Sequence, residues 1–160
     1  MKKRLRFLAL MPLFVLASCI GNSDDAISPK YEAVIMKRQA FENSVSLMPQ
    51  QTIAKAGKLY IKGNLLFVND VNKGFQVYQY DNDGTPQPLQ FINVPGATDL
   101  SMRGNTIYIN QATDLITLAY VNNNITLIKR NKNVFPQKQA PNGSYGTISG
   151  DEVIVDWQQL

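Results

Sequence analysis

The sequence predicts an all-β protein made of β-propeller-like blades, and two observations lead to this class. The phrase KGNLLFVN at Lys62–Asn69 returns 41 residues later as RGNTIYIN at Arg103–Asn110. Each copy also holds four short apolar runs divided by turn residues, and four strands in about 40 residues is the spacing of a propeller blade. A third, partial copy follows at Ile148–Asp156. We therefore expect two four-stranded repeats with part of a third, forming an open or incomplete propeller, and a short N-terminal helix.

The first 18 residues read as an export signal. Four basic residues between Lys2 and Arg6 precede the apolar run Leu5–Val15, which is too short to cross a bilayer. Leu16-Ala17-Ser18-Cys19 then resembles the lipobox of bacterial lipoproteins, whose cysteine receives a diacylglyceryl thioether and becomes the mature N-terminus. The resemblance implies cleavage between Ser18 and Cys19, lipidation of Cys19 and attachment of the protein to a membrane through that lipid. An ordinary secretory signal with a chance cysteine, or an uncleaved anchor, is the alternative.

The polar, turn-rich residues 19–29 read as a flexible tether. No aspartate follows Cys19 directly, so the inner-membrane retention signal of enterobacterial lipoproteins is missing. Ser23-Asp24-Asp25 is similar to the acidic export tags of Bacteroidetes surface lipoproteins, although a solvated linker explains it equally well. We therefore expect the protein at the cell outer membrane, facing either the periplasm or the outside.

The net positive charge of the chain comes from its first residues. Four of the 16 Lys and Arg lie in the signal, which leaves 12 against 12 Asp and Glu. The balanced remainder gives no support for binding to nucleic acid. Cys19 is the only cysteine, so no disulfide can form within the chain.

Residues 30–160 are long enough for one domain with its own core. We divide them into a lead-in at 30–56, repeats at 57–97 and 98–141, and a partial repeat at 142–160. Within the lead-in, Lys37–Ser46 predicts a helix of about two turns that turns Ala40, Phe41 and Val45 toward the sheet.

Each repeat is expected to supply four strands, because Gly-Asn turns between apolar runs are typical of hairpins. The expected strands are Lys58–Lys62, Leu65–Val71, Phe75–Tyr80, Leu89–Val94, Asp99–Arg103, Thr106–Gln111, Leu115–Val121 and Ile125–Arg130. Leu65–Val68 is apolar on both faces, as in inner strands that are covered above and below.

One part of the first repeat has a specific resemblance. The strand Phe75–Tyr80 is followed by Asp81, a Thr85-Pro86 turn, an apolar strand and Pro95-Gly96. This order resembles the LVIVD repeat of bacterial propeller-like proteins, although the second copy departs from it at Asn122–Asn124. Over residues 30–157 the chain also resembles uncharacterised Bacteroidetes lipoproteins that carry this repeat. The resemblance implies a fold and an envelope address, and it brings no catalytic residues.

The number of repeats leaves the ring open, because a closed propeller needs about four blades. Tyr31–Met36 could supply a strand to the third copy, the chain could be a shortened relative without independent function, or partner chains could complete the ring. An open stack leaves unpaired, partly apolar faces, which favours self-association.

The sequence offers little catalytic chemistry. It contains no histidine, which excludes Ser-His-Asp triads and histidine metal sites. Asp81-Asn82-Asp83-Gly84 starts like a calcium loop, but Ile92 stands where an EF-hand needs its last acidic ligand, so we expect a turn. We predict no metal site, no cofactor and no catalytic residue.

Four aspartates remain as candidates, at strand ends or turns: Asp70, Asp99, Asp114 and Asp156. Two of them converging in a pocket would allow a carboxylate-dependent enzyme such as a glycoside hydrolase. Roles in turns and at strand edges account for them more simply.

Two further features indicate contact surfaces. The aromatic side chains could stack on sugars or pack the blades, and the sequence does not separate these uses; they are Trp157, Tyr60, Tyr78, Tyr80 and Tyr108. Val134–Gly143 forms a long loop and is the best candidate for a contact surface, although it could be a bare connector. Gly143–Gly146 is expected to be only a turn. We therefore predict a non-catalytic binding or scaffolding module, with an envelope protein or a glycan as partner.

Overall fold

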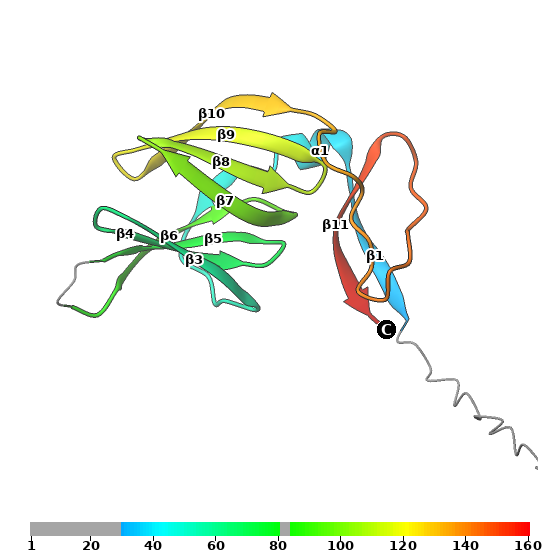
Figure 1. Ribbon diagram of the computed structural model, residues 1–160, viewed down its shortest axis with the longest axis horizontal. Helices are drawn as coiled ribbons and strands as arrows, with labels where there is room; N and C mark the ends of the chain where they lie inside the picture. The colour runs from blue at the N-terminus through cyan, green and yellow to red at the C-terminus, as the bar shows by residue number, and fades with distance from the viewer. Residues whose placement is uncertain (1–29, 81–83) are drawn as a thin grey trace, which may run out of the picture.

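The computed structural model describes residues 30–80 and 84–160, which form three antiparallel β-sheets that do not close into a barrel (Figure 1). The predicted signal peptide, the tether with Cys19, and Asp81–Asp83 of the calcium-like turn lie outside these residues. Among the described residues, no helix has the length and apolar character needed to span a membrane.

The first repeat forms most of a five-stranded sheet with the order β2-β6-β5-β4-β3. Its strands are β3 (Ala56–Lys62), β4 (Leu65–Asp70), β5 (Gly74–Gln79), β6 (Gln87–Asn93) and, from the lead-in, β2 (Ser46–Met48). β4 and β5 are the most buried strands of this sheet. Within the apolar run, Phe67 and Val68 are buried, whereas Leu65 and Leu66 are only partly buried.

The second repeat forms a four-stranded sheet with the order β10-β9-β8-β7. Its strands are β7 (Ala97–Arg103), β8 (Thr106–Gln111), β9 (Asp114–Val121) and β10 (Asn124–Asn131). The eight strands expected from the repeats are confirmed, with differences of a few residues at their ends. Gly63 and Gly104 lie at the same place in the first turn of each repeat and share a φ of 56°, which glycine adopts without steric cost.

The third copy contributes one strand, β11 (Glu152–Gln159), which pairs antiparallel with β1 (Tyr31–Lys37). Of the alternatives that the sequence left open, the pairing of residues 31–36 with the third copy is the one seen in this register. A backbone hydrogen bond of 3.0 Å from Leu160 N–H to Lys30 C=O continues this pairing. In Figure 1 this small sheet stands at one end of the two larger ones.

The predicted helix is shorter than expected. α1 covers only Arg38–Glu42, and the chain then enters β2 at Ser46 instead of remaining helical. The reason is tertiary pairing, because Ser46–Met48 hydrogen-bond along β6 and this pairing overrides the local helical pattern. Phe41 is buried as predicted, whereas Ala40 is exposed.

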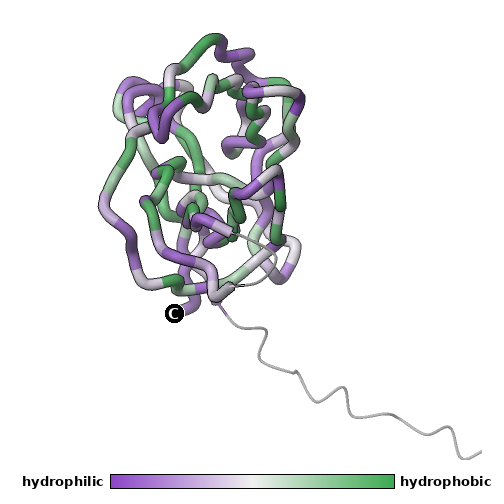
Figure 2. The backbone as a smooth tube through the Cα atoms, turned by 90° about the vertical axis from the view of Figure 1, so that its left-hand side faces the viewer, coloured by the Kyte–Doolittle hydropathy of each residue, from purple (hydrophilic) through white to green (hydrophobic). Residues whose placement is uncertain are grey.

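The main core lies between the two larger sheets. Phe67, Phe75 and Val77 from the first sheet meet Ile107, Ile109, Ile116 and Leu118 from the second. The rings of Phe67 and Tyr120 make an edge contact with centroids 5.7 Å apart. Figure 2 shows hydrophobic and hydrophilic stretches alternating along the backbone, as expected for strands with one buried face.

A smaller core attaches the third sheet. It consists of Phe41, Val153 and Val155, with Met36 and Ala112 packed against them. Ala112 lies in the turn between β8 and β9, so this core joins the third sheet to the end of the second sheet.

Candidate ligand-binding site

Asp70 has a structural role in the first sheet. Its side chain is buried and accepts hydrogen bonds from the backbone N–H groups of Ala54 and Lys55, at 3.1 and 2.9 Å. These bonds fix the segment that leads from β2 into β3. Asp70 therefore has the turn role that the sequence favoured.

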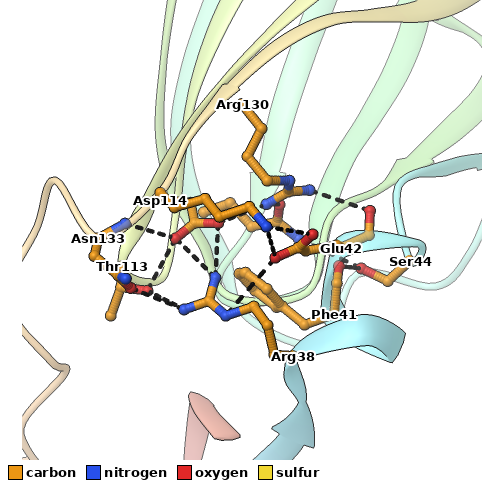
Figure 3. A network of polar contacts seen from close by, with 10 residues as sticks. Arg38, Phe41, Glu42, Ser44, Thr113, Asp114, Arg130 and Asn133 are labelled. Atoms are coloured by element: carbon orange, nitrogen blue, oxygen red, sulfur yellow. Dashed lines mark hydrogen bonds and ion pairs between the residues drawn. The ribbon is translucent and has the colours of Figure 1, made fainter. Parts of the chain in front are cut away.

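Asp114 lies at the centre of a buried ionic network (Figure 3). Arg38 Nη1 lies 3.0 and 2.9 Å from the two carboxylate oxygens, and Arg130 Nη1 lies 3.0 Å from Oδ2. The backbone N–H of Asn133 donates to Oδ1 at 3.0 Å. Both guanidinium groups also lie 5.3 Å from the centroid of the Phe41 ring. The network therefore joins α1 to β9 and β10.

The electrostatics of Asp114 follow from these donors. Burial alone raises the pKa of Asp114, but hydrogen bonds from Asn133, Arg38 and Arg130 outweigh burial and hold this pKa below its ordinary value. A carboxylate stabilised in its charged form is a poor proton donor at neutral pH.

Asp99 connects the edge strands of the two larger sheets. Lys58 Nζ donates to Oδ2 at 2.6 Å, and the Tyr60 hydroxyl donates to Oδ1. The hydrogen bond from Lys58, which has the larger effect, and the one from Tyr60 lower the pKa of Asp99. Burial, followed by the bond to Asp99, raises the pKa of Tyr60. This contact holds β3 against β7.

Asp156 belongs to a chain of contacts between the third sheet, the first sheet and the long loop. Its carboxylate accepts hydrogen bonds from the side-chain amide of Asn72 and from the backbone N–H of Trp157. Lys138 Nζ donates to the Asn72 amide oxygen, and the Trp157 indole N–H donates to Lys138 C=O at 3.2 Å. Burial lowers the pKa of Lys138, against the attraction of Asp156.

The four candidate aspartates thus occupy four different contacts, each with its own protein donors. Within residues 30–80 and 84–160, no group of three Cys, Asp or Glu side chains could hold a metal ion. The structure gives each of these carboxylates a bonding role between segments.

One cavity lies between the two copies of the repeated phrase. It has a volume of about 230 Å³ and is lined by the Gly63-Asn64 and Gly104-Asn105 turns and by apolar side chains below them. Phe67, Ile107 and Tyr120 are among these side chains. The size suits a single apolar group rather than a whole ligand, since ligand pockets usually exceed about 300 Å³.

A larger cavity, which we call the loop pocket, lies between the second sheet and the long loop after β10. It has a volume of about 400 Å³. The second sheet contributes Thr98 and Asn110, its β8–β9 turn contributes Ala112, and the loop contributes Phe135–Gln139 and Tyr145. The predicted contact loop therefore does line a cavity, together with residues that the sequence had not singled out.

Two of the five aromatic side chains proposed for sugar stacking have other roles. Tyr60 packs edge-on against Phe75 and bonds to Asp99, and Trp157 bonds to the loop backbone. Tyr78 and Tyr80 are partly buried, and Tyr108 is 37% exposed.

The sequence missed Tyr145, which is 68% exposed and lines the loop pocket. A tyrosine between two glycines in a long loop, with no apolar neighbour to pack on, is the signal that could have found it.

Comparison with known family models, curated proteins and solved structures gave no match.

Proposed function

We propose that this protein is a lipid-anchored protein of the cell outer membrane whose β-rich domain binds or scaffolds a partner without catalysing a reaction. The observation that supports a binding role is the loop pocket, which combines amide, hydroxyl and aromatic side chains beside a rigid sheet. The lipobox-like sequence before Cys19 supports the anchor.

The contacts of the aspartates favour binding over carboxylate chemistry. A glycosidase needs two carboxyl groups that face a shared substrate, one of them with a raised pKa. Here Asp70 is held by backbone N–H groups, and the donors around Asp99 and Asp114 lower the pKa of each. Such carboxylates are suited to structural roles.

We also propose that the two larger sheets are adjacent propeller-like blades. Each sheet has the four strands of one repeat in sequential order, with β2 added to the first, and the two sheets share one core. The β1–β11 pair would then be a partial third blade completed by the N-terminal strand. The strand order of the two larger sheets and the β1–β11 pairing support this assignment, as does the resemblance to the LVIVD repeat.

The anchor is tested with Cys19→Ser in the native host. We expect the wild-type protein in the membrane fraction, with Cys19 as its N-terminal residue and the mass of the lipid attached to it. The Cys19→Ser variant should lack the lipid mass, because serine offers no thiol for the thioether. A wild-type protein that retains residues 1–18 and carries no lipid would contradict the proposal.

A further inference from the structure

The loop pocket has little net charge of its own. Among the described residues that line it, Lys138 is the only charged side chain. Its ammonium is already engaged, because it donates to Asn72 and is attracted by the Asp156 carboxylate. A charged ligand would therefore find no free counter-charge in the pocket, whereas a neutral ligand would not need one.

The polar groups of the pocket are mostly neutral donors and acceptors. The lining includes the hydroxyl of Thr98 and the amides of Asn110, Gln137 and Gln139. The Gln137 amide nitrogen already donates to Gly146 C=O at 3.4 Å. Amides and hydroxyls both donate and accept hydrogen bonds, so they match a ligand whose own groups do both. Sugar hydroxyls are groups of this kind.

Asn110 differs from the equivalent residue of the first repeat in a way that suits ligand binding. Asn69 donates from its amide nitrogen to Gly74 C=O at 3.1 Å and is fixed by that bond. The Asn110 Oδ1 is buried and accepts no hydrogen bond from the described residues. The Asn110 amide is therefore not held through its oxygen and can reorient when a ligand donor arrives.

The pocket has two aromatic side chains, the partly buried Phe135 and the exposed Tyr145. The Tyr145 side chain is 68% exposed in the loop that borders the pocket. Covering a water-exposed tyrosine ring with a flat apolar surface lowers the free energy of the system, because apolar area is removed from water. A pyranose ring has such a surface, because its C–H groups point to its faces and its hydroxyls to its rim.

We propose that the loop pocket binds a neutral pyranose oligosaccharide, with Tyr145 stacking on one sugar ring and the surrounding amides bonding to its hydroxyls. This assignment rests on the proposed binding function and specifies its ligand class. The volume of about 400 Å³ is that of a site for a short oligosaccharide segment rather than a long chain.

The test is calorimetric titration of the complete protein, purified in a detergent without a sugar head group. The probes are maltohexaose, cellohexaose and mannohexaose, with hexagalacturonate as an anionic control. We expect at least one neutral probe to bind and the anionic one not to bind. Tyr145→Ala should weaken binding about tenfold, which corresponds to about 1.4 kcal/mol, and Tyr145→Phe should retain it because the ring remains.

Leu59→Ala is the matched control, since Leu59 is 64% exposed and lies in β3 of the other large sheet. Leu59→Ala should bind like the wild type. Failure of all neutral probes to bind the folded wild-type protein would overturn the inference, as would binding that is lost in Leu59→Ala but kept in Tyr145→Ala. Stronger binding of hexagalacturonate would also overturn it.

The same samples separate this inference from the proposed function. Each titrated probe is recovered and its length is measured by mass spectrometry. Intact probes with Tyr145-dependent binding support both proposals. Shortened probes would contradict the non-catalytic function while the ligand class stands, and absence of binding would remove the ligand class while the lipid anchor stands.

Discussion

Asn69 and Asn110 occupy the same position of the repeat but contribute differently to stability. Asn69 is 1% exposed, and its amide bonds to Gly74 C=O across the turn between β4 and β5. Asn110 carries a buried Oδ1 that receives no hydrogen bond from the described residues. The same side chain thus makes a structural hydrogen bond in the first repeat, whereas in the second repeat it carries an acceptor without a hydrogen bond.

The repeat provides its own matched pair of variants for this difference. Asn69→Ala should lower the free energy of unfolding by roughly 1–3 kcal/mol, because it removes a buried hydrogen bond and leaves a void. Asn110→Ala should change the free energy of unfolding by less than about 0.5 kcal/mol, because the loss of packing is offset by the removal of an unsatisfied acceptor. Urea denaturation measures both values. Equal losses would show that Asn110 is bonded in solution.

Asp114 should make the stability depend on acid pH. The pKa of its folded form lies below the ordinary value of 3.8, so the charged form is favoured by folding. Its contribution is therefore fully present above the unfolded pKa and is lost as the pH falls through that value toward the folded pKa.

The variant Asp114→Asn should accordingly cost about 3 kcal/mol at neutral pH, because it leaves Arg130 and Arg38 without their buried partner. The difference from the wild type should shrink as the pH falls below about 4. Asp99→Asn is the control, since its partner Lys58 is 65% exposed and such pairs contribute about 1 kcal/mol or less. Urea titrations at several pH values measure these differences, and a constant cost of Asp114→Asn across pH would contradict the ionic explanation.

At the scale of elements, α1 is short but holds three parts of the fold together. It follows β1 of the third sheet directly and leads into β2 of the first. Its Arg38 bonds to Asp114 of the second sheet, and its Phe41 is fully buried in the smaller core. Five residues of helix would be marginal alone, so tertiary contacts must stabilise α1.

Phe41→Ala should therefore lower the free energy of unfolding by about 3–5 kcal/mol, because it opens a cavity and removes two cation–π contacts. Phe41→Leu keeps most of the apolar volume and should cost only about 1 kcal/mol. Gln39→Ala, on the exposed side of the same helix, should change stability by less than about 0.5 kcal/mol. A similar loss in Gln39→Ala would contradict this explanation, because Gln39 is exposed and alanine is the better helix former.

The strands could be predicted from the sequence because their signals are local. Apolar runs between Gly-Asn turns located β8 at Thr106–Gln111, and the structure has the same bounds. β2 could not be predicted in this way, since its pairing with β6 joins residues about 45 positions apart.

The candidate site was less predictable for the same reason. The loop was identified from its length and composition, but Asn110 and Tyr145 meet only through the folding of the loop onto the second sheet. Likewise, no local pattern connects Arg38 to Asp114, which are separated by 76 positions. Contacts of this range depend on the whole fold.

At the scale of the whole molecule, the three sheets are held by cores of unequal size. The two larger sheets share one continuous core, whereas the β1–β11 sheet depends on Phe41, Val153 and Val155. A two-stranded sheet is marginal without such packing. The Asn72–Asp156 hydrogen bond adds a polar link from the third sheet to the first.

The third sheet should therefore unfold before the other two. Trp157, the only tryptophan, lies in β11, so its fluorescence reports on this sheet, while far-ultraviolet circular dichroism reports mainly on the larger ones. In urea, we expect the fluorescence midpoint to lie below the dichroism midpoint, because less apolar area is buried around β11. Asn72→Gly, which keeps the positive φ of this turn without strain, should widen the gap by removing the link to Asp156. Coincident midpoints in both proteins would instead mean that the three sheets form one cooperative unit, in which the N-terminal strand is as strongly held as the central strands of the stack.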